Sequence, residues 1–246
     1  MLPRNFKLTI EYDGTDYSGW QIQKNNMTVQ GEIEYALQKI FQQNKIKLTG
    51  AGRTDAGVHA KEQGAHVFLE SIHTPEKIKN ALNGNIRKDI WIKTCEEIDP
   101  DFHARYSAKV REYRYFISTE YSPLNKNREW YLPRELDLEL LEKCAKLIIG
   151  KHDFTSFCKA NSDVKNKICN VFTCNWTLDK NNLIFTIRAN RYLQHMVRYL
   201  VGTMTEVARG RYIIDQFKNL LNMHEKNIQV FRAPAHGLYL WRIEYE

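Results

Sequence analysis

The sequence predicts an α+β protein with two α/β sandwich halves, each a sheet covered by helices. Segments with the period of strands alternate with segments of helical period, and this order occurs twice along the chain. The join lies near residues 96–106, so residues 1–100 are expected to form an N-terminal half and residues 101–246 a C-terminal half. A length of 246 residues allows the core that such halves require.

The N-terminal half opens with residues 6–12, where apolar and polar side chains alternate as in a half-buried strand. Residues 29–41 have helical spacing, and Thr28 before them is a suitable N-cap. Thr74-Pro75 starts a second helix, because proline fits the first helical position. Further strands are expected at residues 46–49, 64–69 and 90–95.

The C-terminal half repeats this order. Residues 111–118 form an expected strand with Tyr113, Tyr115 and Ile117 on one face. Asp137 is expected to cap a helix that Gly150 ends. The other expected elements are a hairpin of residues 172–178 and 183–187 around the turn 179–182, an amphipathic helix over 193–208, and a final strand over 238–245.

Composition indicates a cytoplasmic protein with no membrane contact. No apolar run approaches the roughly 20 residues of a membrane span, and the first residues lack the apolar core of a signal peptide. The net charge of +7 is weak evidence for a polyanionic partner such as RNA or DNA. The five cysteines show no C-x-x-C spacing, so they are expected to be reduced core residues and neither disulfides nor zinc ligands.

Residues 50–59 are the most informative segment. Three glycines around Asp55 predict a tight turn with positive φ, and Arg53 nearby favours the ionised carboxylate. A charged aspartate in a stiff loop between two strands suits a nucleophile, although Asp-Ala-Gly alone would be an ordinary turn.

The rest of the sequence argues against several other site classes. The nearest acids to Asp55 are Glu62 and Glu70, and no histidine pair has ligand spacing, so no metal site is expected. Glycosidase chemistry needs a second carboxylate, and no residue in the sequence stands out as a candidate for it. No nucleotide-binding glycine motif is present, so a lone nucleophilic carboxylate without a cofactor fits best.

The string Gly-Arg-Thr-Asp-Ala-Gly-Val-His at residues 52–59 resembles the catalytic loop of the TruA family of tRNA pseudouridine synthases. The resemblance runs nearly end to end and keeps the family's order. Its other segments are Tyr12-Asp13-Gly14, Tyr17 to Gln21, the expected central strands Asp101 to Arg105 and Arg111 to Tyr115, then His152 to Phe157, His195 to Arg198 and Gly237 to Leu240.

The resemblance implies a pseudouridine synthase fold, in which two ferredoxin-like halves join their sheets side by side around a basic cleft centred on Asp55. It also implies the isomerisation of several neighbouring uridines in the anticodon stem-loop of tRNA, by a homodimer that holds one tRNA across both subunits. Asp55 would be the nucleophile; attack at C1′, attack at C6 and a glycal route all stay open. The uridine would have to be flipped out of its stem.

The resemblance further assigns the residues around the substrate. Tyr113 would stack on the flipped base, the alternative being a core residue beside Tyr115. Arg198 would pair with Asp55, the alternative being a surface arginine. Arg53 would meet RNA phosphate or help to open the stem, and Leu238 would join the substrate-binding residues. The expected RNA contacts are Phe102, His103, Ala104, Arg105, Tyr106, Lys159 and Lys165, and no acid–base role is expected of His59, His103 or His195.

Two departures from the family pattern bear on RNA contacts. Cys169 stands where many members have arginine, and Lys61-Glu62-Gln63 replaces a glycine-containing step after the loop. The alternative functions are a non-catalytic tRNA-binding or folding protein on the same scaffold and a synthase for another RNA. The retained Asp55 and Arg198 disfavour the first, and the lack of long insertions or tails disfavours the second.

Overall fold

A computed structural model describes residues 2–159, 164–180, 182–222 and 229–246. The chain divides into two compact units, one of Met1–Lys109 with Leu240–Glu246 and one of Val110–Tyr239. Both units contain a sheet and helices, so the predicted α+β class is confirmed. The division of function between residues 1–100 and 101–246, the joining of the sheets and the basic cleft stay predictions.

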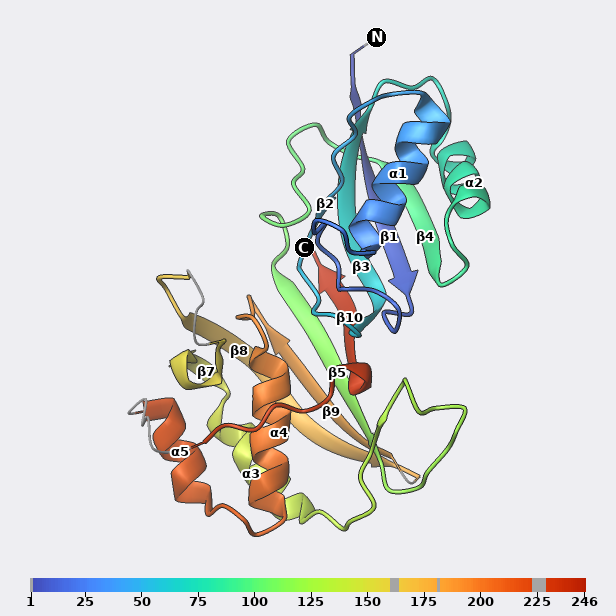
Figure 1. Cartoon of the computed structure of the whole chain (residues 1–246). Helices are drawn as coiled ribbons and strands as arrows, with labels where there is room; N and C mark the ends of the chain where they lie inside the picture. Colours follow the sequence, from blue (N-terminus) through green and yellow to red (C-terminus); the bar gives the residue numbers. More distant parts are fainter. Residues whose placement is uncertain (1, 160–163, 181, 223–228) are drawn as a thin grey trace. The chain divides into compact units, whose positions relative to one another are not determined.

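The first unit contains a sheet with the strand order β4-β1-β3-β10. Two helices, α1 and α2, lie against one face of this sheet (Figure 1). Alternate residues of β1 from Phe6 to Tyr12 are buried, as the sequence predicts. The elements are β1 Arg4–Tyr12, α1 Val29–Phe41, β2 Thr49–Gly50, β3 His59–Leu69, α2 Pro75–Asn85, β4 Ile90–Glu97 and β10 Leu238–Glu244, whose residues from Leu240 onward belong to this unit.

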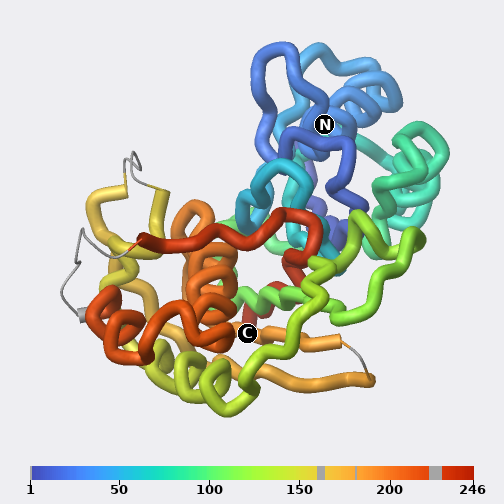
Figure 2. The backbone as a smooth tube through the Cα atoms, turned by 60° about the horizontal axis from the view of Figure 1, so that its bottom comes forward, coloured from blue at the N-terminus to red at the C-terminus, as the bar shows by residue number. Residues whose placement is uncertain are grey.

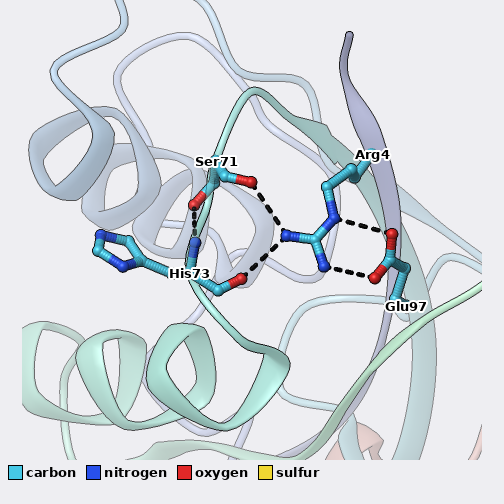
Figure 3. Close-up of polar contacts among 4 residues, drawn as sticks. All are labelled: Arg4, Ser71, His73 and Glu97. Atoms are coloured by element: carbon cyan, nitrogen blue, oxygen red, sulfur yellow. Dashed lines mark hydrogen bonds and ion pairs between the residues drawn. The ribbon is translucent and has the colours of Figure 1, made fainter. Parts of the chain in front are cut away.

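Arg4 fixes the beginning of β1. Its guanidinium pairs with both carboxylate oxygens of Glu97 on β4 and donates from Nη1 to the carbonyl oxygens of Ser71 and His73, each at 3.0 Å (Figure 3). One side chain thus connects the first and last strands of this half with the loop before α2.

The second unit contains the strand order β5-β9-β8-β7, with α3 and α4 against one face of the sheet (Figure 1). Tyr113, Tyr115 and Ile117 are all buried on the predicted face of β5. The elements are β5 Val110–Ser118, β6 Trp130–Tyr131, α3 Leu138–Leu147, β7 Gly150–Asp153, η1 Thr155–Phe157, β8 Ile168–Asp179, β9 Asn182–Ala189, α4 Met196–Ala208, α5 Ile214–Asn222 and η2 Ala235–Gly237.

Side-chain caps fix three helix starts where the sequence predicts them. Thr28 accepts from the backbone N–H of Gly31 at 3.3 Å, Thr74 accepts from Lys77 at 3.4 Å, and Asp137 accepts from Leu140 at 3.0 Å. The predicted hairpin is also present, since β8 and β9 pair antiparallel, although Asn181 of its turn lies outside the described residues.

Several predicted boundaries are wrong, and the strand expected from Gly64 already begins at His59. Residues 46–48 are not a strand, because side chains of α1 bind the backbone of Leu48: Glu34 accepts from its N–H at 2.8 Å and Gln30 donates to its carbonyl oxygen at 2.9 Å. The helix predicted from residue 193 begins at Met196, because His195 has a φ of 66° and cannot extend it.

The cysteines are all free thiols, and four of the five are buried, as predicted for core residues. Within the described ranges, no helix has both the length and the apolar character that crossing a membrane requires.

Candidate active site

The loop between β2 and β3 carries Asp55 at the start of a tight turn. The N–H of Val58 donates to the carbonyl oxygen of Asp55 at 3.2 Å, and Gly57 has a φ of 75°. A left-handed residue at this point is cheap only for glycine. Asp55 is half-buried, whereas Arg53 is exposed. The backbone therefore holds the carboxylate-bearing residue in one defined turn, with an arginine projecting to solvent two residues earlier.

The segment of residues 13–20 packs its backbone directly on this loop. The N–H of Gly57 donates to Tyr17 at 3.2 Å, and the N–H of Trp20 donates to Thr54 at 3.1 Å. A Cβ on Gly19 would lie 2.6 Å from the carbonyl oxygen of Thr54, and Gly19 has a φ of 98°. No side chain other than hydrogen fits there, so close backbone contact determines the shape of the loop.

The three glycines of the loop have different roles. The expected positive φ occurs at Gly57 alone among them. Gly50 is needed for packing, because a Cβ would lie 2.6 Å from the indole of Trp20. At Gly52 a Cβ would meet no described atom within 4 Å, and nothing in the structure explains this glycine.

His59 is buried at the end of the loop. Its Nδ1 accepts from the N–H of Gly14 at 3.0 Å and lies 3.2 Å from a carboxylate oxygen of Asp13. This contact holds the 13–20 segment beside the beginning of β3.

Tyr113 lies on β5 with 8% of its surface exposed. The centroid of its ring lies 4.9 Å from that of Tyr192, and the two ring planes are nearly perpendicular, at 78°. The hydroxyl of Tyr192 donates to the carbonyl oxygens of Arg111 and Ile187, at 3.1 and 2.9 Å. Tyr113 is therefore held in a fixed orientation by a second tyrosine, which is itself tied to the sheet. Its stacking on a uracil stays a prediction.

Arg198, on α4, is half-buried and bound to the segment that follows α5. Its Nε donates to the carbonyl oxygen of Ala233 at 2.8 Å, and the N–H of Ala233 donates back to Arg198 at 3.0 Å. The hydroxyl of Tyr115 donates to Pro234 at 2.9 Å, and the charge of Arg198 opposes the rise in the pKa of Tyr115 that burial causes. Arg198 is thus oriented within its unit; its pairing with Asp55 stays a prediction.

Residues 229–237, which we call the strap, cross over α4 (Figure 1 and Figure 2). The N–H of Phe231 donates to the hydroxyl of Thr203 at 3.2 Å, and a Cβ on Gly202 would lie 2.2 Å from the carbonyl oxygen of Phe231. The strap leads directly into Leu238, which is buried as the first residue of β10. Its substrate contact stays a prediction.

The expected RNA-contact segment, Phe102 to Tyr106, is a turn, so the expectation that it belongs to a strand is wrong. The reason is that Nδ1 of His103 accepts from the N–H groups of Arg105 and Tyr106, at 3.2 and 3.3 Å, which folds the chain back. Ala104 is buried, whereas Arg105 and Tyr106 are exposed and lie within cation–π distance, at 5.7 Å. The two exposed side chains could serve an RNA surface; their contact stays a prediction.

The turn of residues 102–106 is also held by the neutral form of His66, so the stability of the protein should depend on pH. Nδ1 of the buried His66 accepts from the N–H of Ala104. The pKa of His66 is lowered from 6.5 to about 4, mainly because the ring is buried and to a smaller extent because of the charge of His103. Because the pKa of His66 is lower in the folded protein than in the unfolded chain, the unfolded chain binds a proton first. The contribution of His66 to stability is therefore complete above pH 6.5 and is lost as the pH falls towards 4. We expect the free energy of unfolding to fall by about 1–2 kcal/mol from this group between pH 7 and pH 5.

Urea unfolding at both pH values measures this effect. His66→Asn, which places an amide oxygen near the position of Nδ1 but does not titrate, is the matched variant. The native chain should lose more stability on acidification than the variant does. Equal losses in the two proteins would contradict the assignment.

Lys159 and Lys165 are both exposed, as a phosphate-binding role requires, and their RNA contacts stay predictions. Cys169 is fully buried on β8, where burial raises its pKa to about 11. The side chain at this departure from the family pattern therefore fills the core. The other departure, Lys61-Glu62-Gln63, lies in β3 where the register with β1 shifts between Ile10 and Tyr12; Lys61 pairs with Glu11 at 2.6 Å and Glu62 with Lys93 at 3.0 Å.

Comparison with known proteins identifies the family. A family model described as tRNA pseudouridine synthase matches residues 8–107 and 144–246. A protein of Pelodictyon phaeoclathratiforme named tRNA pseudouridine synthase A is 42% identical over 243 residues, 98% of this chain and 100% of that protein. Proteins of the same name from Geobacillus sp. (strain WCH70) and Listeria innocua are 39% and 38% identical, covering 100% and 98% of this chain and 100% and 99% of their own lengths. The chain therefore belongs to the tRNA pseudouridine synthase family and is an isomerase.

Proposed function

We propose that this protein converts uridine to pseudouridine in the anticodon stem-loop of tRNA, without a cofactor. The observation that carries the proposal is the half-buried Asp55 in a turn enforced by backbone packing, in a chain of this family. In the reaction the N1–C1′ bond breaks, the uracil rotates, and C5 bonds to C1′. The proton on C5 leaves and N1 gains one, so the product is an isomer of the substrate.

Asp55 is the proposed nucleophile. A carboxylate can form a covalent bond to the substrate and later release it, which divides one difficult step into two easier ones. Its position in a fixed turn supports this role, because a nucleophile that is already placed loses little freedom in the transition state. The bond that it forms, to C1′ or to C6, and the glycal route remain open.

The remaining predicted residues have supporting roles in this proposal. Tyr113 stacks on the flipped uracil, Arg198 pairs with Asp55, and Leu238 contacts the substrate. Tyr113 and Arg198 are each held by neighbours in their own unit, which suits side chains that must meet a substrate in one orientation. Arg53 is exposed in the loop and is proposed to meet RNA phosphate or help to open the stem.

We further propose that a homodimer in the cytoplasm holds one tRNA across both subunits. RNA stems are recognised largely by shape and backbone, which would allow several neighbouring uridines to be accepted without a sequence code. The positive net charge and the exposed Arg105, Lys159 and Lys165 support binding to a phosphate backbone.

Mapping of pseudouridine in tRNA transcripts tests the proposed function. The protein is incubated with a transcript, and carbodiimide adducts are then located by primer extension. We expect stops at uridines of the anticodon stem-loop and none when those uridines are changed to cytidine. Stops confined to other parts of the tRNA would contradict the anticodon-arm proposal, and tight binding without any stop would favour a non-catalytic tRNA-binding protein.

A further inference from the structure

Three buried polar side chains meet at the catalytic loop. They come from β1, from the loop itself and from β3, and Tyr12, Thr54 and Gln63 are 3%, 7% and 0% exposed. The hydroxyl of Tyr12 is 2.8 Å from that of Thr54. Nε2 of Gln63 donates to the carbonyl oxygen of Gly52 at 2.9 Å.

These contacts hold the loop at two points just before the aspartate. Gly52 and Thr54 are bound from the protein interior, and Thr54 directly precedes Asp55 in the chain. The two side chains that bind them stand on neighbouring strands, because β1 and β3 pair antiparallel, with a shift of register between Ile10 and Tyr12. Arg53, between the two held residues, is exposed. Displacement of the loop at these two points requires the hydrogen bonds from Tyr12 and Gln63 to break.

We propose that Tyr12 is a positioning residue, whose hydroxyl holds Thr54 and thereby fixes Asp55 where the carboxylate can react. This inference rests on the proposed function, in which Asp55 is the nucleophile. Burial raises the pKa of Tyr12 well above its ordinary value, so the hydroxyl keeps its proton at neutral pH. Tyr12 is almost fully buried and acts through its hydrogen bond to Thr54.

Tyr12→Phe is the first test, because it removes the hydroxyl and keeps the ring, whose centroid lies 6.0 Å from that of the Trp20 ring. A displacement of about 1 Å at a reacting group can cost about a hundredfold in rate. We expect kcat for tRNA to fall about tenfold or more, with KM within about twofold, since an interaction that matters only in the transition state lowers kcat.

Variants of Thr54 test the same contact from the other side. Thr54→Val keeps the shape but lacks the hydroxyl and should lower kcat as Tyr12→Phe does. Thr54→Ser keeps the hydroxyl and should retain most of the activity. In the double variant Tyr12→Phe/Thr54→Val the loss should be smaller than the two single losses multiplied together, because both changes remove one shared contact.

Tyr17→Phe is the matched control. Tyr17 is 2% exposed in the same unit, and its hydroxyl donates to Asp89 at 2.5 Å. Its contact with the catalytic loop is made by its backbone carbonyl oxygen, which accepts from Gly57 and is kept in Tyr17→Phe. It should lose stability to a similar extent and keep its kcat. Amide hydrogen exchange of residues 52–57 should become faster in Tyr12→Phe and stay unchanged in Tyr17→Phe.

The outcomes separate this inference from the proposed function. If the native chain is active, Asp55→Asn is inactive and Tyr12→Phe keeps its full kcat, the positioning role is overturned and the proposed function stands. If both tyrosine variants lose kcat in step with stability, Tyr12 is only structural. If the native chain forms no pseudouridine, the proposed function fails and the positioning role fails with it.

Discussion

Asp55→Asn is expected to abolish pseudouridine formation while tRNA binding stays within about twofold of the native affinity. Asparagine has nearly the same size, so the turn closed by Val58 is retained, but an amide does not act as a nucleophile. Loss of a nucleophile in other enzymes lowers kcat by about 10⁴-fold or more. Affinity is retained because a carboxylate does not attract phosphate. Single-turnover assays and filter binding measure the two quantities.

Asp16→Asn is the matched control, because Asp16 is an exposed aspartate in the segment that packs on the loop. It removes the same charge from the same unit and should keep activity within about twofold. An active Asp55→Asn protein would remove Asp55 from its proposed role. If both variants lost activity, the loss would be explained by the change in net charge and not by the removal of a specific nucleophile.

Gly19→Ala is expected to disrupt the loop strongly. The new Cβ would lie 2.6 Å from the carbonyl oxygen of Thr54 and 3.1 Å from the carbonyl carbon of Asp55, at a φ of 98°. Unfavourable backbone geometry and forced repacking together should lower the free energy of unfolding by about 2–4 kcal/mol. The loop must move to relieve the contact, so kcat should fall as well. Urea unfolding and the tRNA assay measure both effects.

Gly84→Ala provides the comparison for that result. Gly84 lies inside α2, its φ is not positive, and a Cβ there would meet no described atom within 4 Å. Alanine should leave activity unchanged and raise stability by up to about 1 kcal/mol, because it restricts the unfolded chain and favours helix. Similar behaviour of the two variants would show that backbone contact at Gly19 does not determine the loop.

Much of the fold could be predicted because local sequence specifies it. The alternation from Phe6 to Tyr12 and the caps at Thr28, Thr74 and Asp137 depend on residues near each other in the chain. Two of the errors arise where distant contacts decide. The backbone of Leu48 is bound by side chains of α1, and the last residues of the chain, Leu240–Glu246, belong to the first unit. No local pattern indicates either contact.

The same distinction applies to the site. The string around Asp55 nominates the loop, but the residues that shape it come from elsewhere in the sequence. Gly19 shapes the loop because its backbone lies close to the carbonyl oxygen of Thr54. Gln63 shapes it because its side chain donates a hydrogen bond to the carbonyl oxygen of Gly52. The resemblance includes both Gly19 and Tyr12, but neither the partner of Gly19 nor the contact of Tyr12 with Thr54 can be read from the sequence.

Release of tritium from tRNA carrying uridine labelled at C5 tests the central claim most directly. The assay contains the native chain, a chelator and neither metal nor nucleotide. Because C5 must lose its hydrogen when it bonds to C1′, we predict one tritium released for each uridine converted, over many turnovers per protein. Tight tRNA binding without tritium release would contradict the account and identify the chain as an RNA-binding protein on a synthase scaffold.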